Sequence, residues 1–382
     1  MSRRSADLPL HGGSAPSWLF RRMVDLAGAI GVLIVRDQGP AELLRRLSDP
    51  FWFQAFGCVL GFDWHSSGVT TTVCGALKEA AKKMGSDLGL VVCGGKGKTS
   101  RKTPDDIRRA CDKFGDDADR LIRASKLVAK VDSAAVQDGY QLYHHAFFFV
   151  PGSGKWSVVQ QGMNETTRYA RRYHWLSETM PSFVSEPHAA VACDTKSDTL
   201  NLVAGETDAH RDALTRLSRE TPERVLREIR VALVDEPMPL FEAVRPRALR
   251  AAPALVMPSR HSLSVSDLNP ASVKKVLLAT YEKQATSFEG LLGATGVGPM
   301  ALRSLSLIAE LIYNAPASRR DPAAYSFAHG GKDGHPYFVN RPVYDASVER
   351  LREAINRAKV GHSDKVESLR ALAKFTSRLA KA

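Results

Sequence analysis

The sequence predicts an α/β N-terminal domain, a mixed sheet with helices, followed by an all-α C-terminal domain. Short apolar runs alternate with helix-like patterns through the first half of the chain. A proline-rich segment, VDEPMPLFEAVRPRALRAAPALVMPSRH, then interrupts the pattern, and helical spacing resumes after it. We therefore expect an α/β domain with a candidate catalytic site at residues 1–194, a polar helical insert and linker at 195–262, and a helical domain at 263–382.

The composition of the chain limits the classes of protein to which it can belong. A chain of 382 residues with 44% hydrophobic residues can bury a large core, and two or three domains are expected. A formal charge of +12 favours a polyanionic partner through counterion release. No run is long and apolar enough to predict a membrane span or a signal peptide, which points to the cytoplasm. The five cysteines form no C-x-x-C pair, which argues against a disulfide framework or a structural zinc site.

The first domain begins with an apparent β–α–β–α order. Residues 59–64, VLGFDW, are expected to form a buried strand and residues 69–83 a helix. Residues 88–95 then form a second strand, and Thr103 caps the next helix with Pro104 in its first turn. This order predicts a parallel layer, in which ligands lie beyond the carboxyl ends of the strands.

Two loops follow these expected strands. In the first, Asp63 and His65 are candidates for a metal carboxylate and a proton carrier, although an aspartate before a helix is often only a cap. The second loop combines glycine with hydroxyl and basic residues, which suits a phosphate cradle. Its candidate phosphate contacts are Lys96, Lys98, Arg101 and Lys102. The spacing is not that of a Walker A loop, and an exposed charged loop is the alternative.

Residues 129–150 and 155–164 are expected to form two strands joined by the turn 151–154. The polar residues on or beside them are Asp132, Asp138, His144, His145, Gln160 and Gln161. Such groups are costly among apolar neighbours unless they are hydrogen-bonded or functional. Asp63, Asp132 and Asp138 are therefore candidate ligands for Mg²⁺ or Mn²⁺, with His145 as a proton carrier. The alternative is an internal hydrogen-bond network, and the acid-x-Lys of a restriction-nuclease-like core is missing.

Residues 167–176, TRYARRYHWL, interleave basic and aromatic side chains. Arg168, Arg171 and Arg172 are candidates for gripping phosphates while the aromatic rings stack on unpaired bases. If the segment is instead a helix, its aromatic rings face the core and only the arginines stay outside.

Residues 288–312, FEGLLGATGVGPMALRSLSLIAELI, resemble a helix-hairpin-helix motif, which holds the backbone of DNA or structured RNA. Gly296 and Gly298 let the main chain bend and approach a phosphate closely, and Val297 fits into the core of the motif. Pro299 suits the first helical position, and free amides at that helix N-terminus attract an anion. The alternative is an ordinary helical connection with a glycine hinge.

A longer set of segments resembles an uncharacterised archaeal and bacterial family that is described only as a domain of unknown function. The segments are LPLHGGSAPSWLFRRM, FGCVLGFDWHSSGVTTTVCGALKE, GGKGKTSRKTP, QDGYQLYHH, VVQQGMN, RYARRYHW, GVGPMALRSLSLIAELIY and DPAAYSFAHGGKDGHPY. The resemblance covers nearly the whole chain. Nucleic-acid repair or processing is implied only by the helix-hairpin-helix resemblance.

Together these patterns predict a DNA-binding and DNA-processing enzyme, most simply a metal-dependent nuclease. A glycosylase is a second hypothesis, with Asp321 or a carboxylate of the N-terminal domain as the catalytic group and Lys332 as a nearby phosphate contact. The alternative for Asp321, which precedes Pro322, is the cap of a short turn. Met300 stands where such glycosylases often carry a lysine, which argues against lyase chemistry. A non-catalytic binder of damaged or branched DNA is a third hypothesis. RNA stays open as a partner, as does a homodimer through the C-terminal helices.

Overall fold

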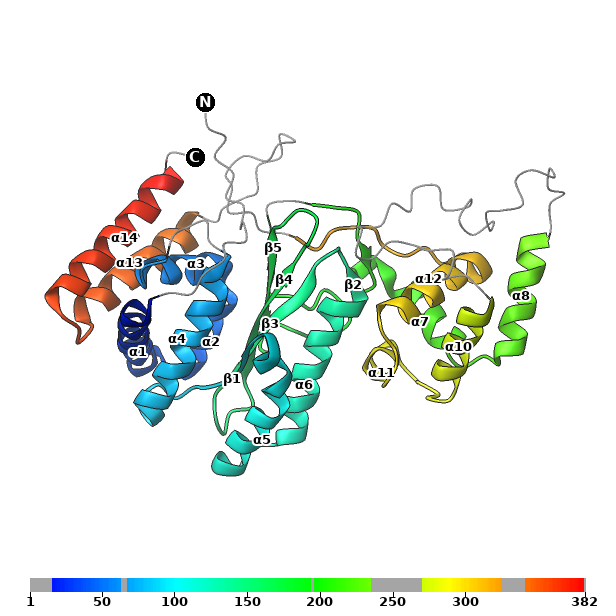
Figure 1. Cartoon of the computed structure of the whole chain (residues 1–382), viewed down its shortest axis with the longest axis horizontal. Coiled ribbons are helices and arrows are strands. Elements are labelled where there is room, and N and C mark those ends of the chain that lie inside the picture. The colour runs from blue at the N-terminus through cyan, green and yellow to red at the C-terminus, as the bar shows by residue number, and fades with distance from the viewer. Residues whose placement is uncertain (1–15, 63–66, 194–195, 235–269, 324–340, 381–382) are drawn as a thin grey trace.

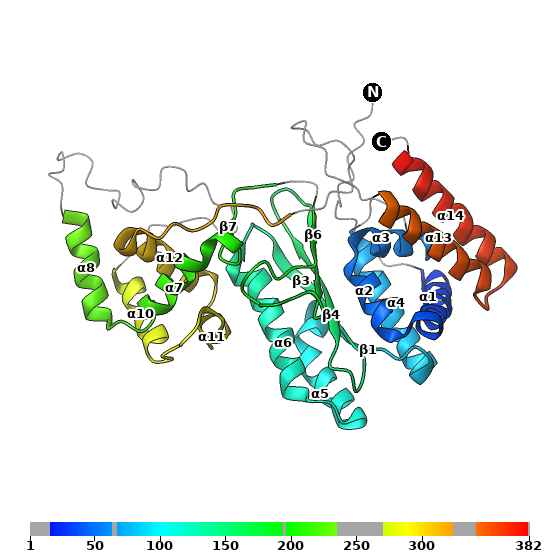
Figure 2. The ribbon, with the colours of Figure 1, turned by 180° about the vertical axis from the view of Figure 1, so that it is seen from behind.

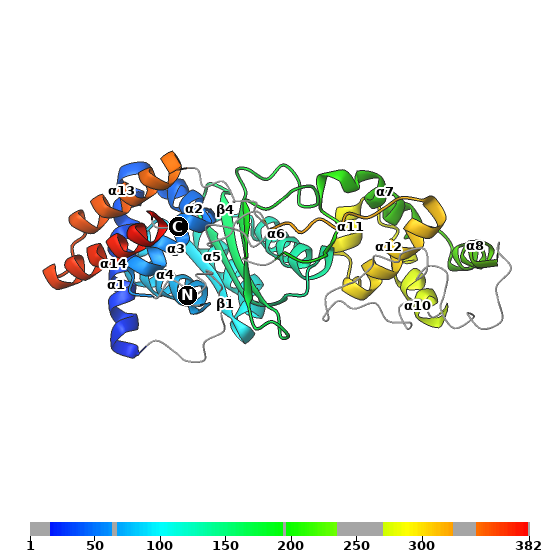
Figure 3. The same ribbon diagram turned by 90° about the horizontal axis from the view of Figure 1, so that it is seen from above.

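The computed structural model describes residues 16–62, 67–193, 196–234, 270–323 and 341–380. A central sheet stands between two groups of helices (Figure 1). The view from behind shows the same three parts, and the view from above shows them side by side along the longest axis (Figures 2 and 3). No described helix has the length and apolar character needed to cross a membrane.

The sheet has five strands in the order β1-β3-β4-β5-β6, and every neighbouring pair is antiparallel. The strands are β1 Val91–Lys96, β3 Gln141–Phe149, β4 Trp156–Met163, β5 Ala170–Leu176 and β6 Ala190–Ala192. A second, two-stranded sheet pairs β2, Val136–Gln137, with β7, Leu200–Asn201. The predicted β-hairpin across residues 151–154 is confirmed as β3 and β4. The predicted mixed or parallel pairing is wrong for the described strands.

One face of the sheet is covered by the first helices and the last ones. These are α1 Ser17–Gln38, α2 Pro40–Ser48, α3 Pro50–Val59, α4 Gly68–Met84, α13 Arg341–Arg357 and α14 His362–Ala380. Ala146, Phe148 and Val159 point from the sheet into this first core. Leu351 and Ile355 of α13 are buried in it too, and α14 packs on α3.

The opposite face holds the second core. Phe147, Phe149 and Val158 enter it, alternating with the residues of the first core as a pleated strand requires. Its helices are α5 Thr103–Phe114, α6 Ala118–Lys130, α7 Asp208–Leu217, α8 Pro222–Val234, α10 Pro270–Tyr281, α11 Phe288–Gly293 and α12 Pro299–Tyr313. The described residues also form four short helical turns: η1 Gly85–Asp87, η2 Gly97–Lys102, η3 Val131–Ala135 and η4 Gly205–Thr207.

The described helices after residue 263 are divided between the two cores. Helices α10 to α12 pack with α7 and α8, which the sequence placed in the insert, whereas α13 and α14 pack on α1 and α3. The helices after residue 263 therefore do not form one packed domain. A homodimer through the C-terminal helices stays a prediction, although α13 and α14 already bury apolar side chains within the chain.

Two strand predictions are wrong at the level of local structure. The strand predicted at residues 59–64 is not formed in its described part, because Val59 is the last residue of α3, Leu60 caps that helix and Gly61 lies in the turn after it. Helix α3 begins at Pro50, which fits the first turn, and Asp49 accepts hydrogen bonds from the amides of Phe51 and Trp52. Residues 129–135 end α6 and form the π-helical turn η3, so the first strand of the β-hairpin begins only at Gln141. Thr103 is the first residue of α5 rather than its cap.

Candidate functional site

Residues 294–298 form a tight turn between α11 and α12. Ser287 begins α11, and its hydroxyl accepts a hydrogen bond from the Gly290 amide at 3.1 Å. Val297 is 1% exposed and packs into the second core, so it anchors the turn as expected. Pro299 occupies the first turn of α12.

The two glycines of the 294–298 turn differ in conformation. Gly296 has a φ of 88°, a region that favours glycine. Gly298 has a φ of −123° and a ψ of −172°, which is extended backbone open to any residue, so the expectation that both glycines bend the chain is corrected. A Cβ atom at either position would meet no described atom within 4 Å. Among the described residues, nothing therefore fills the space beside these two glycines.

Helix α6 and the turn that follows it support the 294–298 turn from one side. The ammonium of Lys130, half-buried at the end of α6, donates to the carbonyl oxygen of Val297. Burial lowers the pKa of Lys130 below its ordinary value. Gln137 donates to the Pro299 carbonyl at 2.9 Å and accepts from Arg303 at 3.0 Å. The turn is thus fixed to the sheet domain through polar contacts.

The candidate metal ligand Asp132 lies inside the protein in a hydrogen-bond network. Its side chain is 0% exposed and accepts from the Gln160 amide and from Trp175 Nε1 at 2.9 Å, and His188 Nε2 lies 2.5 Å from it. Gln160 Oε1 also lies 2.7 Å from His145 Nδ1, and burial lowers the pKa of His145. The structure thus connects Asp132 and His145 through Gln160 and keeps both away from a surface-bound strand.

Asp138 belongs to a second buried group. It accepts hydrogen bonds from Arg171 at 2.9 Å and from Tyr173 at 2.6 Å, and Arg171 also donates to Asp321 at 2.8 Å. Burial raises the pKa of Asp138, and Arg171 opposes that shift. Over the described ranges, no three His, Cys, Asp or Glu side chains are arranged to hold a metal ion.

The basic residues of β5 are not at the surface, which corrects their expected role. Arg171 and Arg172 are 0% exposed because β5 lies between β4 and β6 with helices over both faces of the sheet. Arg172 donates to Gln54 at 3.0 Å, inside the first core. Neither guanidinium can grip a phosphate in this arrangement. Arg168, in the turn before β5, is exposed.

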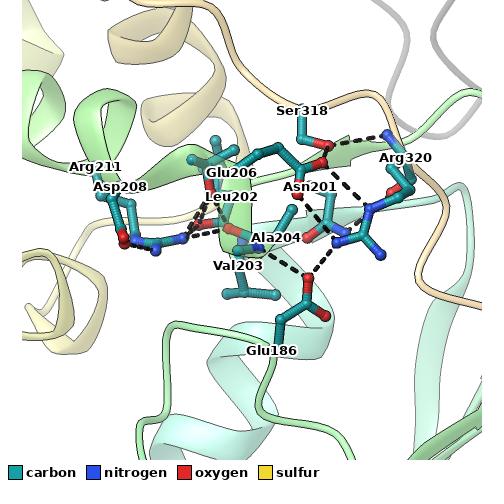
Figure 4. Close-up of polar contacts among 12 residues, drawn as sticks. Glu186, Asn201, Leu202, Val203, Ala204, Glu206, Asp208, Arg211, Ser318 and Arg320 are labelled. Carbon is teal, nitrogen blue, oxygen red and sulfur yellow. Dashed lines mark hydrogen bonds and ion pairs between the residues drawn. The ribbon is translucent and has the colours of Figure 1, made fainter.

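The residues that follow α12, up to residue 323, are hydrogen-bonded to the region around β7. Arg320 donates to Glu206 at 3.1 Å and to Glu186, and Figure 4 shows its guanidinium between these two carboxylates. The carboxylate of Asp321 is 4% exposed and accepts from the Ala323 amide at 2.8 Å. Asp321 therefore makes the turn hydrogen bond that was the alternative to a catalytic role.

The predicted phosphate loop is the exposed helical turn η2, at the end of β1. The basic side chains of the predicted loop are all exposed: Lys96 at the end of β1, and Lys98, Arg101 and Lys102 in η2. The ammonium of Lys96 lies 6.0 Å from the Tyr143 ring centroid, and Gln161 donates to the Ser67 carbonyl at 3.0 Å. These contacts bring η2 and the start of α4 near the same end of β3 and β4. Asp63, His65 and Lys332 lie outside the described residues.

A model of the family named "Protein of unknown function (DUF763)" matches residues 4–339. The chain belongs to this family. The DUF763 match includes the central sheet, both buried networks and the 294–298 turn, and it ends before α13. No curated protein and no solved structure matches the chain.

Three residues of the DUF763 chain that support the 294–298 turn were missed from the sequence: Lys130, Gln137 and Arg303. They are separated from one another by up to 173 positions, and no short motif contains them. The available signal was weak: a lysine at the end of an amphipathic helix is commonly explained by the helix dipole alone.

Proposed function

We propose that this chain binds the backbone of DNA, with structured RNA as the alternative partner, through a helix-hairpin-helix module made of α11, the 294–298 turn and α12. The observation that carries the proposal is the open outer side of the turn, where a Cβ at Gly296 or Gly298 would meet no described atom within 4 Å. A phosphate can approach such a main chain closely, and the N-terminus of α12 favours an anion there.

Charge supports the same partner. Lys130 adds a positive charge beside the turn, and Arg123 and Lys126 are exposed on the same helix, α6. The whole chain carries a formal charge of +12. Cations that neutralise phosphates release condensed counterions, so binding of this kind is expected to weaken steeply with salt.

Metal-dependent cleavage by this chain stays a prediction. In the described part of the chain Asp132 and Asp138 are occupied by internal donors, so Asp63 is the candidate acid best suited to a mutational test. The residues present therefore favour binding over cleavage as the proposed function.

The test of binding and cleavage uses the full chain and a panel of labelled single strands, duplexes, forks, damaged duplexes and a structured RNA. Each DNA is incubated with Mg²⁺, Mn²⁺ or EDTA and analysed with and without alkali. Binding that falls with salt, without breaks, supports the proposed function. Breaks that require metal and disappear in Asp63→Asn add nuclease activity, and alkali-dependent breaks in EDTA add base excision. Absence of binding to every DNA and to structured RNA sinks the proposal.

A further inference from the structure

A cavity of about 400 Å³ lies beside α6, at the end of the β3–β4 hairpin. Its walls combine cations, one carboxylate and large apolar side chains. They include Arg120, Arg123, Lys155, Glu178, Met180 and Phe183, with Trp156 behind them. A volume of this size is in the range of small-molecule sites, and a few polar groups among apolar walls are typical of them.

The aromatic wall consists of stacked rings. Trp156, at the start of β4, is 5% exposed and lies between two rings. Its centroid is 5.6 Å from that of Phe147 and 6.0 Å from that of Phe183, with interplanar angles of 24° and 9°. Phe183 is only partly buried, so it is the ring with free surface in the cavity. A flat ring of a ligand can stack on it.

The cations are placed for an anion next to that ring. Arg120 donates to the Gly154 carbonyl at 2.9 Å, and no carboxylate of the described residues pairs with it. Gly154 has a φ of 66°, a left-handed conformation that favours glycine, and it brings the main chain close to Arg120 Nη2. Lys155 pairs with Glu178 at 2.7 Å. Arg120 therefore keeps unneutralised charge and further N–H donors at the cavity.

Helix α6 connects the cavity to the 294–298 turn. Arg123 pairs with Glu289 of α11 at 2.5 Å, and Lys130 contacts Val297. Arg120, Arg123 and Lys130 recur at helical spacing on one side of α6, and the first and last are about 15 Å apart along its axis. A few nucleotides of an extended strand span such a length.

We propose that this cavity binds one unpaired nucleotide of a strand whose neighbouring backbone is held at the 294–298 turn. The base stacks on Phe183, and its phosphate contacts Arg120. The inference rests on the proposed function because that function supplies the strand. A free mononucleotide also has a flat base and a phosphate. The experiment therefore distinguishes a free mononucleotide from a nucleotide that is part of a strand.

The experiment measures the affinity of the full chain for three labelled DNAs by fluorescence anisotropy. They are a blunt duplex, the same duplex with a short single-stranded overhang, and the same duplex with an abasic overhang of equal phosphate number. We expect the normal overhang to bind more tightly than the other two by about 5-fold or more, the effect of one stacked base. Phe183→Ala should remove this preference and leave blunt-duplex affinity unchanged, while Phe183→Tyr should retain it. Phe114→Ala, which changes an exposed phenylalanine on α5, is the matched control.

Equal affinity for the normal and the abasic overhang overturns the proposal that the cavity binds a base. The proposal is also overturned if the folded Phe183→Ala variant still prefers the normal overhang. If adenosine monophosphate alone binds as tightly as the DNA with the normal overhang, the cavity is a site for a free nucleotide. The proposal that it binds a nucleotide of a strand is then overturned. Failure of the proposed function has a different signature: blunt-duplex affinity is then absent or independent of the 294–298 turn.

Discussion

The ammonium of Lys130 donates a hydrogen bond to the carbonyl oxygen of Val297, which joins the end of α6 to the 294–298 turn. The contact has two consequences. It fixes the orientation of the turn relative to the sheet domain, and it places a positive charge beside main chain that is open to solvent. No described carboxylate pairs with Lys130, so its charge is available to an anion.

Replacing Lys130 with glutamine should weaken DNA binding about 5- to 10-fold at low salt, because one phosphate contact is lost. The slope of log affinity against log salt should become shallower by about 0.9. Lys130→Arg should retain most of the affinity. Anisotropy titrations over a salt series measure both quantities, with Lys83→Gln on α4 as the control. An unchanged affinity and slope would remove Lys130 from the interface.

Gly298→Leu tests the open side of the turn without straining the backbone. Gly298 is in extended conformation and a Cβ there meets no described atom within 4 Å, so the variant should keep its melting temperature. The leucine side chain occupies the space through which a phosphate approaches, so duplex affinity should fall at least about 10-fold.

The matched control for Gly298→Leu is Gly361→Leu, an exposed position just before α14. It makes the same chemical change far from the turn and should leave binding intact. If Gly298→Leu binds duplex as tightly as the unmodified chain while remaining folded, the helix-hairpin-helix proposal is wrong.

The helices on either side of the 294–298 turn could be predicted because every signal there is local. A serine cap, a glycine with positive φ, a buried valine and a proline in the first turn lie within thirteen residues, Ser287 to Pro299. The β-hairpin of β3 and β4 was equally local, with a Pro-Gly-Ser-Gly turn between two apolar runs. Local signals of this kind need no knowledge of tertiary packing.

The rest depended on partners distant in sequence. The short apolar run that begins at Val59 suits a buried strand as well as the end of a buried helix, and capping at Asp49 together with burial against other helices makes Val59 the end of α3. The arginines of β5 looked like surface residues because charged side chains are rarely buried unless paired. Arg171 has such pairs, Asp138 and Asp321, but the second lies 150 positions away.

The buried His144 should make stability depend on pH. It is 1% exposed, and its ring nitrogens have no hydrogen-bond partner among the described residues. Burial lowers its pKa from 6.5 to about 3. The unfolded chain therefore binds this proton more readily than the folded one. The stabilisation is complete above the unfolded pKa and is lost as pH falls from 6.5 toward 3, at about 1.4 kcal/mol per pH unit.

His144→Met removes this titration without removing a hydrogen bond. Between about pH 7.5 and about pH 5, the melting temperature of the variant should fall by less than that of the unmodified chain. Some dependence should remain, because burial also lowers the pKa values of His145, His174 and His210. His362→Met, at the exposed start of α14, is the control. Identical pH profiles for His144→Met and the unmodified chain would contradict the burial of a neutral His144.

Arg171→Met should be strongly destabilising, by about 3–5 kcal/mol, because it leaves the buried carboxylates of Asp138 and Asp321 without their cation. The effect should also depend on pH. Burial already raises the pKa of Asp138 against the opposing charge of Arg171, so the pKa should rise further in the variant. A carboxyl with a raised folded pKa binds its proton more readily in the folded state. The variant should therefore lose additional stability as pH rises through that folded pKa.

Chemical denaturation of Arg171→Met at two pH values measures both effects, and a second variant separates charge from packing. Adding Asp138→Asn to Arg171→Met removes one of the two stranded carboxylates, so the double variant should be more stable than Arg171→Met alone at neutral pH. If the double variant is instead less stable by the sum of the two single effects, the residues act independently. The instability of Arg171→Met would then not come from leaving Asp138 without its cation.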